Sequence, residues 1–96
     1  MTLLITIKRT DMRVKVEYGN RVRETDVDKT EIVDTNSIKR LYFDLKRKYI
    51  AEHEIDGDPN NSALDYLNEF SEVCDVENTF YIGFEEGAYI EGWQLV

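Results

Sequence analysis

The spacing of apolar residues changes twice along this chain, and this change limits the fold more than any other feature. Apolar and polar residues alternate over residues 2–8 and 12–18, recur with a helical period over residues 38–75, and alternate again after residue 79. A period of two indicates a strand, and a period of about 3.6 indicates a helix. The predicted order is therefore β-β-β-α-α-β-β. Because strands and helices fall in separate runs, we expect the α+β class, with an antiparallel sheet of about five strands and two helices packed on one face.

Length and composition favour one compact domain that spans residues 1–96. A chain of 96 residues can bury about two-thirds of its surface in one modest core. The hydrophobic fraction of 42% excludes general disorder, and one proline and five glycines exclude fibrous or low-complexity chains.

A tight hairpin is predicted near the start of the chain. Residues 19–20 are Gly-Asn, a pair that tolerates positive φ and suits a two-residue turn. The register of such a hairpin places Lys15 opposite Glu24. It also places Arg13 opposite Asp26, so that charges of opposite sign face each other on one side.

The first helix is predicted to follow the N-cap residues at 34–37 and to run to about His53. Its apolar stripe consists of Ile38, Leu41, Tyr42, Leu45 and Tyr49. The second helix is predicted to start at Ser62, which forms a capping box with Asp65, and to run to about Asp75. Its stripe consists of Ala63, Leu67, Phe70 and Cys74.

The charges are divided sharply between the two halves of the chain. All twelve Lys and Arg residues lie in residues 1–48 beside eight acids, which makes this half +4. Residues 49–96 hold twelve acids and no Lys or Arg, which makes this half −12. Taken as a whole, a protein with a net charge of −8 is repelled by nucleic acids and anionic membranes.

The sequence favours a soluble protein of the cytoplasm. No run of about 18 apolar residues is present, and the start of the chain lacks the basic region of a signal peptide. One cysteine, Cys74, cannot form an internal disulfide, which favours a reducing compartment.

Residues suited to catalysis are nearly absent. His53 is the only histidine, and no nucleophile or phosphate-binding motif accompanies it. Asp75 and Glu77 beside Cys74 disfavour a reactive thiolate. We therefore expect no enzyme and no cofactor.

A metal site is not expected either. Asp56, Asp58 and Asn60 match the first three ligand positions of a calcium loop. The match then fails, because Asn61 replaces the required glycine and Leu67 replaces the required glutamate. A turn is the favoured interpretation.

Acidic residues of the second half form a candidate partner-binding face. Asp65, Glu69 and Glu72 are predicted to line one side of the second helix, and Glu85 and Glu86 lie in the turn of the last hairpin. Such a face either keeps the protein soluble or binds a basic surface on a partner. Tyr89 and Trp93 in the last strand are candidate aromatic anchors of the same contact.

The first helix has a second candidate surface opposite its apolar stripe. Large apolar residues stand there among bases: Lys39, Arg40, Phe43, Arg47 and Ile50. Three interpretations remain open, namely packing within the molecule, a homodimer or protein partner, and contact with nucleic acid. Further bases for nucleic acid are Arg13, Lys15, Arg21 and Arg23.

No motif identifies a family. In size, net charge and the stripe of Asp65, Glu69 and Glu72, the chain resembles small acidic inhibitors of phages and mobile elements, including anti-restriction and anti-CRISPR proteins. This resemblance implies a non-enzymatic, DNA-mimic-like module that blocks the basic surface of a nucleic-acid-processing protein. If the protein is encoded by a phage, its compartment is the cytoplasm of the bacterial host cell. The alternatives are a structural or regulatory subunit that dimerises through Phe43 and Ile50, and a nucleic-acid binder that uses the basic half.

Overall fold

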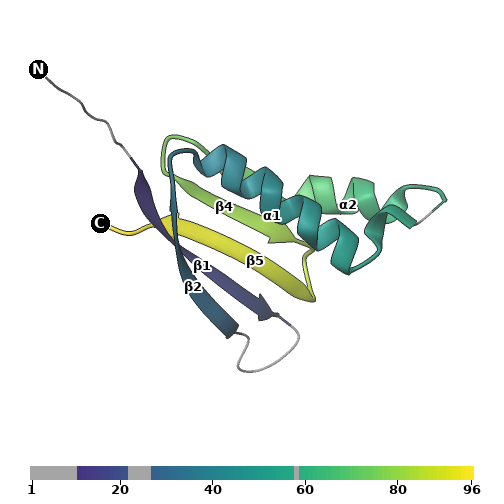
Figure 1. The fold of residues 1–96 in the computed structure, drawn as a ribbon. Coiled ribbons are helices and arrows are strands. Elements are labelled where there is room, and N and C mark those ends of the chain that lie inside the picture. Colours follow the sequence, from purple (N-terminus) through teal and green to yellow (C-terminus); the bar gives the residue numbers. More distant parts are fainter. Residues whose placement is uncertain (1–10, 22–26, 58) are drawn as a thin grey trace, which may run out of the picture.

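The computed structural model describes residues 11–21, 27–57 and 59–96 and has one layer of strands under one layer of helices (Figure 1). The strands are β1 (Met12–Asn20), β2 (Val27–Thr35), β3 (Glu72–Cys74), β4 (Thr79–Gly83) and β5 (Ala88–Gln94). They form one sheet in the order β2-β1-β5-β4-β3, with every neighbouring pair antiparallel. The helices are α1 (Ile38–Glu52), the short 3-10 helix η2 (Ile55–Gly57) and α2 (Ser62–Phe70), and they cover one face. The predicted α+β class with five antiparallel strands and two α-helices is confirmed.

The order of elements along the chain differs from the predicted one. Within the described residues, two strands precede the helices and three follow them. The predicted first strand, residues 2–8, lies outside the described residues. The additional strand is β3, the first of the three after the helices, and it occupies residues that the sequence predicts as the last turn of the second helix. Cys74 therefore lies on a strand and not on a helical stripe.

The end of α2 has a clear physical cause. Ser71 adopts an extended conformation, with φ of −87° and ψ of 141°. Its buried hydroxyl oxygen accepts a hydrogen bond from the backbone N–H of Gly83 at 3.1 Å. This contact directs the chain out of the helix and alongside β4, so the helical pattern of residues 71–75 does not continue the helix.

The predicted register of the first hairpin is wrong. β1 continues to Asn20, and β2 begins only at Val27. Arg13 lies opposite Asp34, and their side chains form an ion pair at 3.5 Å. Residues 19–20 therefore belong to β1 and do not form a two-residue turn.

The two helices differ in how well the sequence predicts their starts. Ser37 caps α1 as predicted, because its Oγ accepts a hydrogen bond from the backbone N–H of Arg40 at 3.1 Å. The capping box predicted for α2 is wrong, because Ser62 is the first helical residue and the N-cap is Asn61, with φ of 58°. In the described ranges, no helix has both the length and the apolar composition needed to cross a bilayer.

The core lies between the helices and the sheet. Side chains with the predicted spacing on α1 meet β1, β4 and β5: Ile38, Tyr42, Leu45, Tyr49, Val14, Val16, Phe80, Ile82 and Ile90. Leu67 of α2 completes it and is fully buried. Since successive residues of a strand point to opposite faces, the alternate side chains of each strand project from the helix-free face of the sheet.

Candidate functional site

The helix-free face of the sheet carries aromatic and acidic side chains. Glu91 and Trp93 of β5 flank a core position, so they project away from the helices. Tyr81 of β4 lies directly opposite Glu91, and Thr79 lies directly opposite Trp93. Tyr81 and Trp93 are therefore diagonal neighbours across two paired strands, at a separation that large rings can span.

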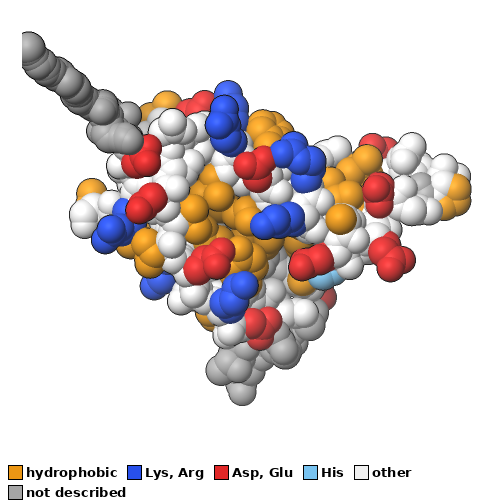
Figure 2. All heavy atoms as spheres, viewed as in Figure 1, with side chains coloured by type: hydrophobic (Ala, Val, Ile, Leu, Met, Phe, Trp, Pro, Cys, Tyr) orange, Lys and Arg blue, Asp and Glu red, His pale blue; other side chains and the backbone are white. Residues whose placement is uncertain are grey.

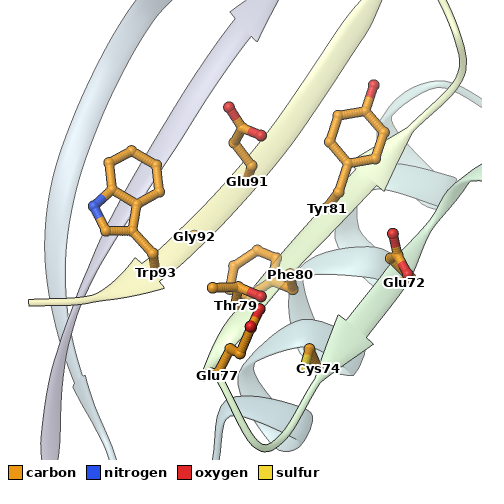
Figure 3. A pocket seen from close by; sticks show the side chains of 9 residues that line it. All are labelled: Glu72, Cys74, Glu77, Thr79, Phe80, Tyr81, Glu91, Gly92 and Trp93. Atoms are coloured by element: carbon orange, nitrogen blue, oxygen red, sulfur yellow. The ribbon is translucent and has the colours of Figure 1, made fainter.

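A groove of about 420 Å³ crosses this face over β3, β4 and β5 (Figure 3). We call it the sheet-face groove. Its lining includes three carboxylates, two half-buried aromatic rings and a thiol: Glu72, Glu77, Glu91, Tyr81, Trp93 and Cys74. The buried ring of Phe80 also borders it. Glu72 and Cys74 come from β3, and Glu77 comes from the turn that joins β3 to β4. The groove thus gathers acids that lie up to 19 residues apart in the sequence.

The charge of the groove is only partly balanced within the molecule. Nη2 of Arg21 lies 3.6 Å from Oε2 of Glu91. In the part of the chain that the structure describes, no Lys or Arg nitrogen comes within ion-pair distance of Glu72 or Glu77. Burial, followed by the nearby charge of Glu72, raises the pKa of the Tyr42 hydroxyl. The groove is therefore a site of negative potential with two carboxylates open to a cation.

Cations of the chain already lie over aromatic rings on this face. The guanidinium carbon of Arg21 lies 4.3 Å from the ring centroid of Tyr89 and 5.4 Å from that of Tyr81. Nζ of Lys15 lies 5.8 Å from the ring centroid of Trp93. A cation within about 6 Å of an aromatic ring is attracted by the negative face of the ring. Hydrogen bonding to Tyr81 raises the pKa of Arg21 above its ordinary value, although partial burial acts in the opposite direction.

The groove offers little to a metal or a cofactor. Among the described residues, no three His, Cys, Asp or Glu side chains are grouped closely enough to hold a metal ion. Cys74 is a half-buried free thiol. Asp58, part of the calcium-loop pattern, lies outside the described residues. The chemistry that the groove supports is the binding of a cation by carboxylates and aromatic rings.

The structure separates the residues of the predicted acidic face. Glu72 lies on β3 and lines the sheet-face groove. Asp65 and Glu69 lie on the exposed side of α2, and Glu85 and Glu86 lie in the exposed turn between β4 and β5. The continuous acidic stripe predicted on the second helix is wrong, because α2 ends before Glu72.

The two predicted anchors have different surroundings. Trp93 is half-buried and lines the groove. Tyr89 is only 3% exposed, because Arg21 covers its ring and Tyr81 packs against it with ring centroids 6.1 Å apart. Tyr89 thus supports Arg21 and presents little surface of its own.

Sequence reasoning did not select Tyr81, Glu77 and Glu91 as site residues. The useful signal for two of them was the alternation of the last two strands, which places Tyr81 and Glu91 on the same side as Trp93.

Tyr66 was also missed. It is 51% exposed on α2, and its ring lies 5.2 Å from Phe70 and 6.2 Å from Phe84, measured between centroids.

The exposed side of α1 forms a second, basic surface. A shallow hollow there is lined by Ser37, Lys39, Arg40, Phe43, Asp44 and Arg47. We call it the α1 surface. Phe43 is 47% exposed, whereas Ile50 is half-buried and packs against the core. Figure 2 shows basic and acidic side chains interspersed over the helix-covered face, with apolar side chains between them.

Ion pairs between described residues join the basic and acidic halves of the chain. Nζ of Lys39 lies 3.1 Å from a carboxylate oxygen of Asp75, and Arg21 pairs with Glu91. Arg47 pairs within its own half, with Asp44. Some acids of the second half are therefore neutralised by bases of the first half. The acids that are not neutralised in this way include Glu72 and Glu77 of the groove.

Comparison with protein-family models, curated sequences and solved structures finds no match to this chain.

Proposed function

We propose that the protein is a non-enzymatic binding module whose sheet-face groove takes a cationic side chain from a basic surface of a partner protein. One observation carries this proposal. Three carboxylates and two aromatic rings meet in one groove, and within the described residues two of those carboxylates have no cation beside them.

The groove has the physical properties that recognition of a cation requires. Its walls hold carboxylates for charge-assisted hydrogen bonds and aromatic rings for cation–π contact. The negative half of the chain attracts a positively charged partner over distances of about one Debye length, roughly 8 Å in physiological salt. Tyr and Trp are the residues that most often anchor protein interfaces.

The inhibitor function expected from the sequence uses the same chemistry. A partner that binds DNA or RNA holds a row of Lys and Arg side chains to contact phosphates. A module that takes those side chains in a carboxylate groove excludes the nucleic acid by occupancy and by charge. In this form of the proposal, the partner is a nucleic-acid-processing protein in the host cell of a phage or mobile element.

The experiment measures binding of a short peptide of arginine, lysine and glycine through the fluorescence of Trp93, the only tryptophan. The test variant is Glu72→Gln with Glu77→Gln. The matched control is Glu85→Gln with Glu86→Gln, which removes the same charge from the exposed turn outside the groove. We expect about tenfold weaker binding for the test variant, because partly exposed ion pairs contribute about 0.5–1 kcal/mol each.

The control decides between a site and a diffuse charge effect. We expect it to bind within about twofold of the wild type at physiological salt, where exposed charges outside the groove are screened. Equal weakening of the two variants would show that net charge, and not the groove, attracts the peptide. Equal binding by all three proteins would show that the peptide binds elsewhere.

A second candidate function is self-association through the α1 surface. The exposed ring of Phe43 between Arg40 and Arg47 favours it, because an exposed aromatic ring within a hollow is typical of an interaction site. The helical spacing of these three residues places them on one side of α1.

A further inference from the structure

We infer that the sheet-face groove is specific for the guanidinium group of an arginine side chain, and that Arg21 of this chain competes with that ligand for Glu91. The inference rests on the proposed function, since it names the ligand group of the same groove. It starts from the guanidinium of Arg21, which the structure already places against two aromatic rings of this face.

Arg21 shows how this face binds a guanidinium. Its planar group covers the buried ring of Tyr89 at 4.3 Å and approaches the ring of Tyr81 at 5.4 Å. Glu91 supplies the carboxylate at 3.6 Å. The backbone N–H of Arg21 donates to the carbonyl oxygen of Gly87 at 3.0 Å, which fixes the base of the side chain.

Two of the groups that hold Arg21 also line the groove. These are Tyr81 and Glu91, which lie opposite each other on β4 and β5. On the groove side, Trp93 is the diagonal neighbour of Tyr81, and Glu72 is the direct neighbour of Tyr81 on β3. The groove therefore repeats the elements around Arg21, namely two aromatic rings and a carboxylate, and adds the carboxylates of Glu72 and Glu77.

These elements favour arginine over lysine. A guanidinium is planar, stacks on aromatic rings and donates several hydrogen bonds in one plane to carboxylates. An ammonium group is compact and strongly hydrated, and it gains less from a ring face. The contacts within the chain agree, because Lys15 stands 5.8 Å from the ring of Trp93 while Arg21 stands 4.3 Å from that of Tyr89.

Arg21 is placed to compete and not to block. It lies beside the groove, is not part of its lining, and shares the carboxylate of Glu91. The distance of 3.6 Å between the charged atoms exceeds that of a normal charge-assisted hydrogen bond, about 2.8 Å. The side chain of Arg21 is 38% exposed, so its guanidinium can move into solvent when a ligand binds Glu91.

The experiment compares three peptides that are identical except for one central residue: arginine, lysine, or citrulline, which has the shape of arginine without its charge. Each is titrated against the wild-type protein and against the variants Arg21→Gln and Arg13→Gln. Arg13 is the matched control, because it is exposed on the same sheet face, pairs with Asp34 and is not part of the groove. Both variants change the net charge by the same amount.

We expect the arginine peptide to bind at least about fivefold tighter than the lysine peptide and the citrulline peptide to bind weakest. We expect Arg21→Gln to tighten binding of the arginine peptide about three- to fivefold and Arg13→Gln to leave it within about twofold. Arg21→Lys keeps the charge, loses the planar group and should fall between Arg21→Gln and the wild type. Thermal unfolding of each variant checks that the fold is retained.

Each other outcome contradicts a specific statement. Equal binding of the arginine and lysine peptides would overturn guanidinium specificity while leaving the proposed cation groove intact. Unchanged or weaker binding by both Arg21 variants would overturn the competition. If none of the three peptides bound to any of the proteins, the proposed function itself would fail.

Discussion

Gly92 of β5 lies against the ring of Phe80 of β4: a Cβ atom on Gly92 would come within 2.5 Å of Cε2 and 2.6 Å of Cζ of that ring. The two residues are direct cross-strand neighbours. The Phe80 ring is buried and lies 6.1 Å from the ring of Tyr42 on α1, measured between centroids. The ring fills the space that any side chain at position 92 would need, which explains a glycine in the middle of a central strand.

Gly92→Ala should lower the free energy of unfolding by about 1–3 kcal/mol, because the buried ring of Phe80 has to move for the new methyl group. Gly57→Ala is the control, since a Cβ at Gly57 meets no heavy atom within 4 Å. Urea denaturation of both variants measures the difference. A Gly92 variant as stable as the Gly57 variant would contradict the close packing of this strand pair.

Ser71 is the residue that turns the chain from α2 into β3. Ser71→Ala should destabilise the protein by about 1–3 kcal/mol, because it leaves the buried N–H of Gly83 without its hydrogen bond. Ser62→Ala, on the exposed first residue of α2, should change stability by less than about 0.5 kcal/mol. Hydrogen exchange should also show faster exchange at the Gly83 amide in the Ser71 variant alone.

Local features of this fold were readable from the sequence. The N-cap at Ser37 and the stripe from Ile38 to Tyr49 depend on residues within a few positions of one another, and both were predicted correctly. The register of the hairpin of β1 and β2 was predicted wrongly, because opposite charges face each other in both registers: Arg13 faces Asp26 in the predicted one and Asp34 in the observed one. The observed register also pairs Val14 with Val33 across the core side of the sheet, which the local pattern does not reveal.

The groove shows the same division. The period of two in the last strands predicts that Glu91 and Trp93 share a face, and they do. Glu72 was assigned to a helix, because the end of α2 is decided by a hydrogen bond from the backbone N–H of Gly83, twelve residues further along the chain, to Oγ of Ser71. The approach of Arg21 to Glu91 joins residues 70 positions apart, and only the sheet order brings them together.

Tyr49 should make the protein less stable in alkaline solution. Burial, followed by the nearby Tyr81, raises the pKa of Tyr49 from 10.0 to about 12. The hydroxyl donates a hydrogen bond to the carbonyl oxygen of Ala88 at 2.6 Å, which requires its proton. In the unfolded chain, the proton leaves near pH 10, so the stabilisation is complete below that pH and is lost as the pH rises toward about 12.

Tyr49→Phe removes this titration. The variant should be about 1–3 kcal/mol less stable at neutral pH, because the Ala88 carbonyl loses its donor, and its stability should fall less steeply above pH 10. Urea denaturation at a series of pH values measures both effects. Parallel pH curves for the two proteins would show that other tyrosines, such as the buried Tyr42, cause the alkaline instability.

Self-association through the α1 surface can be separated from partner binding by the groove with a charged substitution at Phe43. Phe43 is 47% exposed, and its ring packs edge-on against Tyr42 with centroids 4.9 Å apart, so its position is fixed by the core residue behind it. If the α1 surface mediates self-association, the wild type should show a concentration-dependent mass in light scattering, and Phe43→Glu should remain a monomer. Ile32→Glu is the matched control: Ile32 is similarly exposed, at 52%, and lies on the helix-free side of β2, away from α1. Loss of self-association in both variants would point to repulsion by the added charge, because a specific contact of the Phe43 ring is insensitive to a carboxylate on the opposite face of the sheet. A wild type that stays monomeric at high concentration would contradict the second candidate function and leave the groove as the interaction surface of the protein.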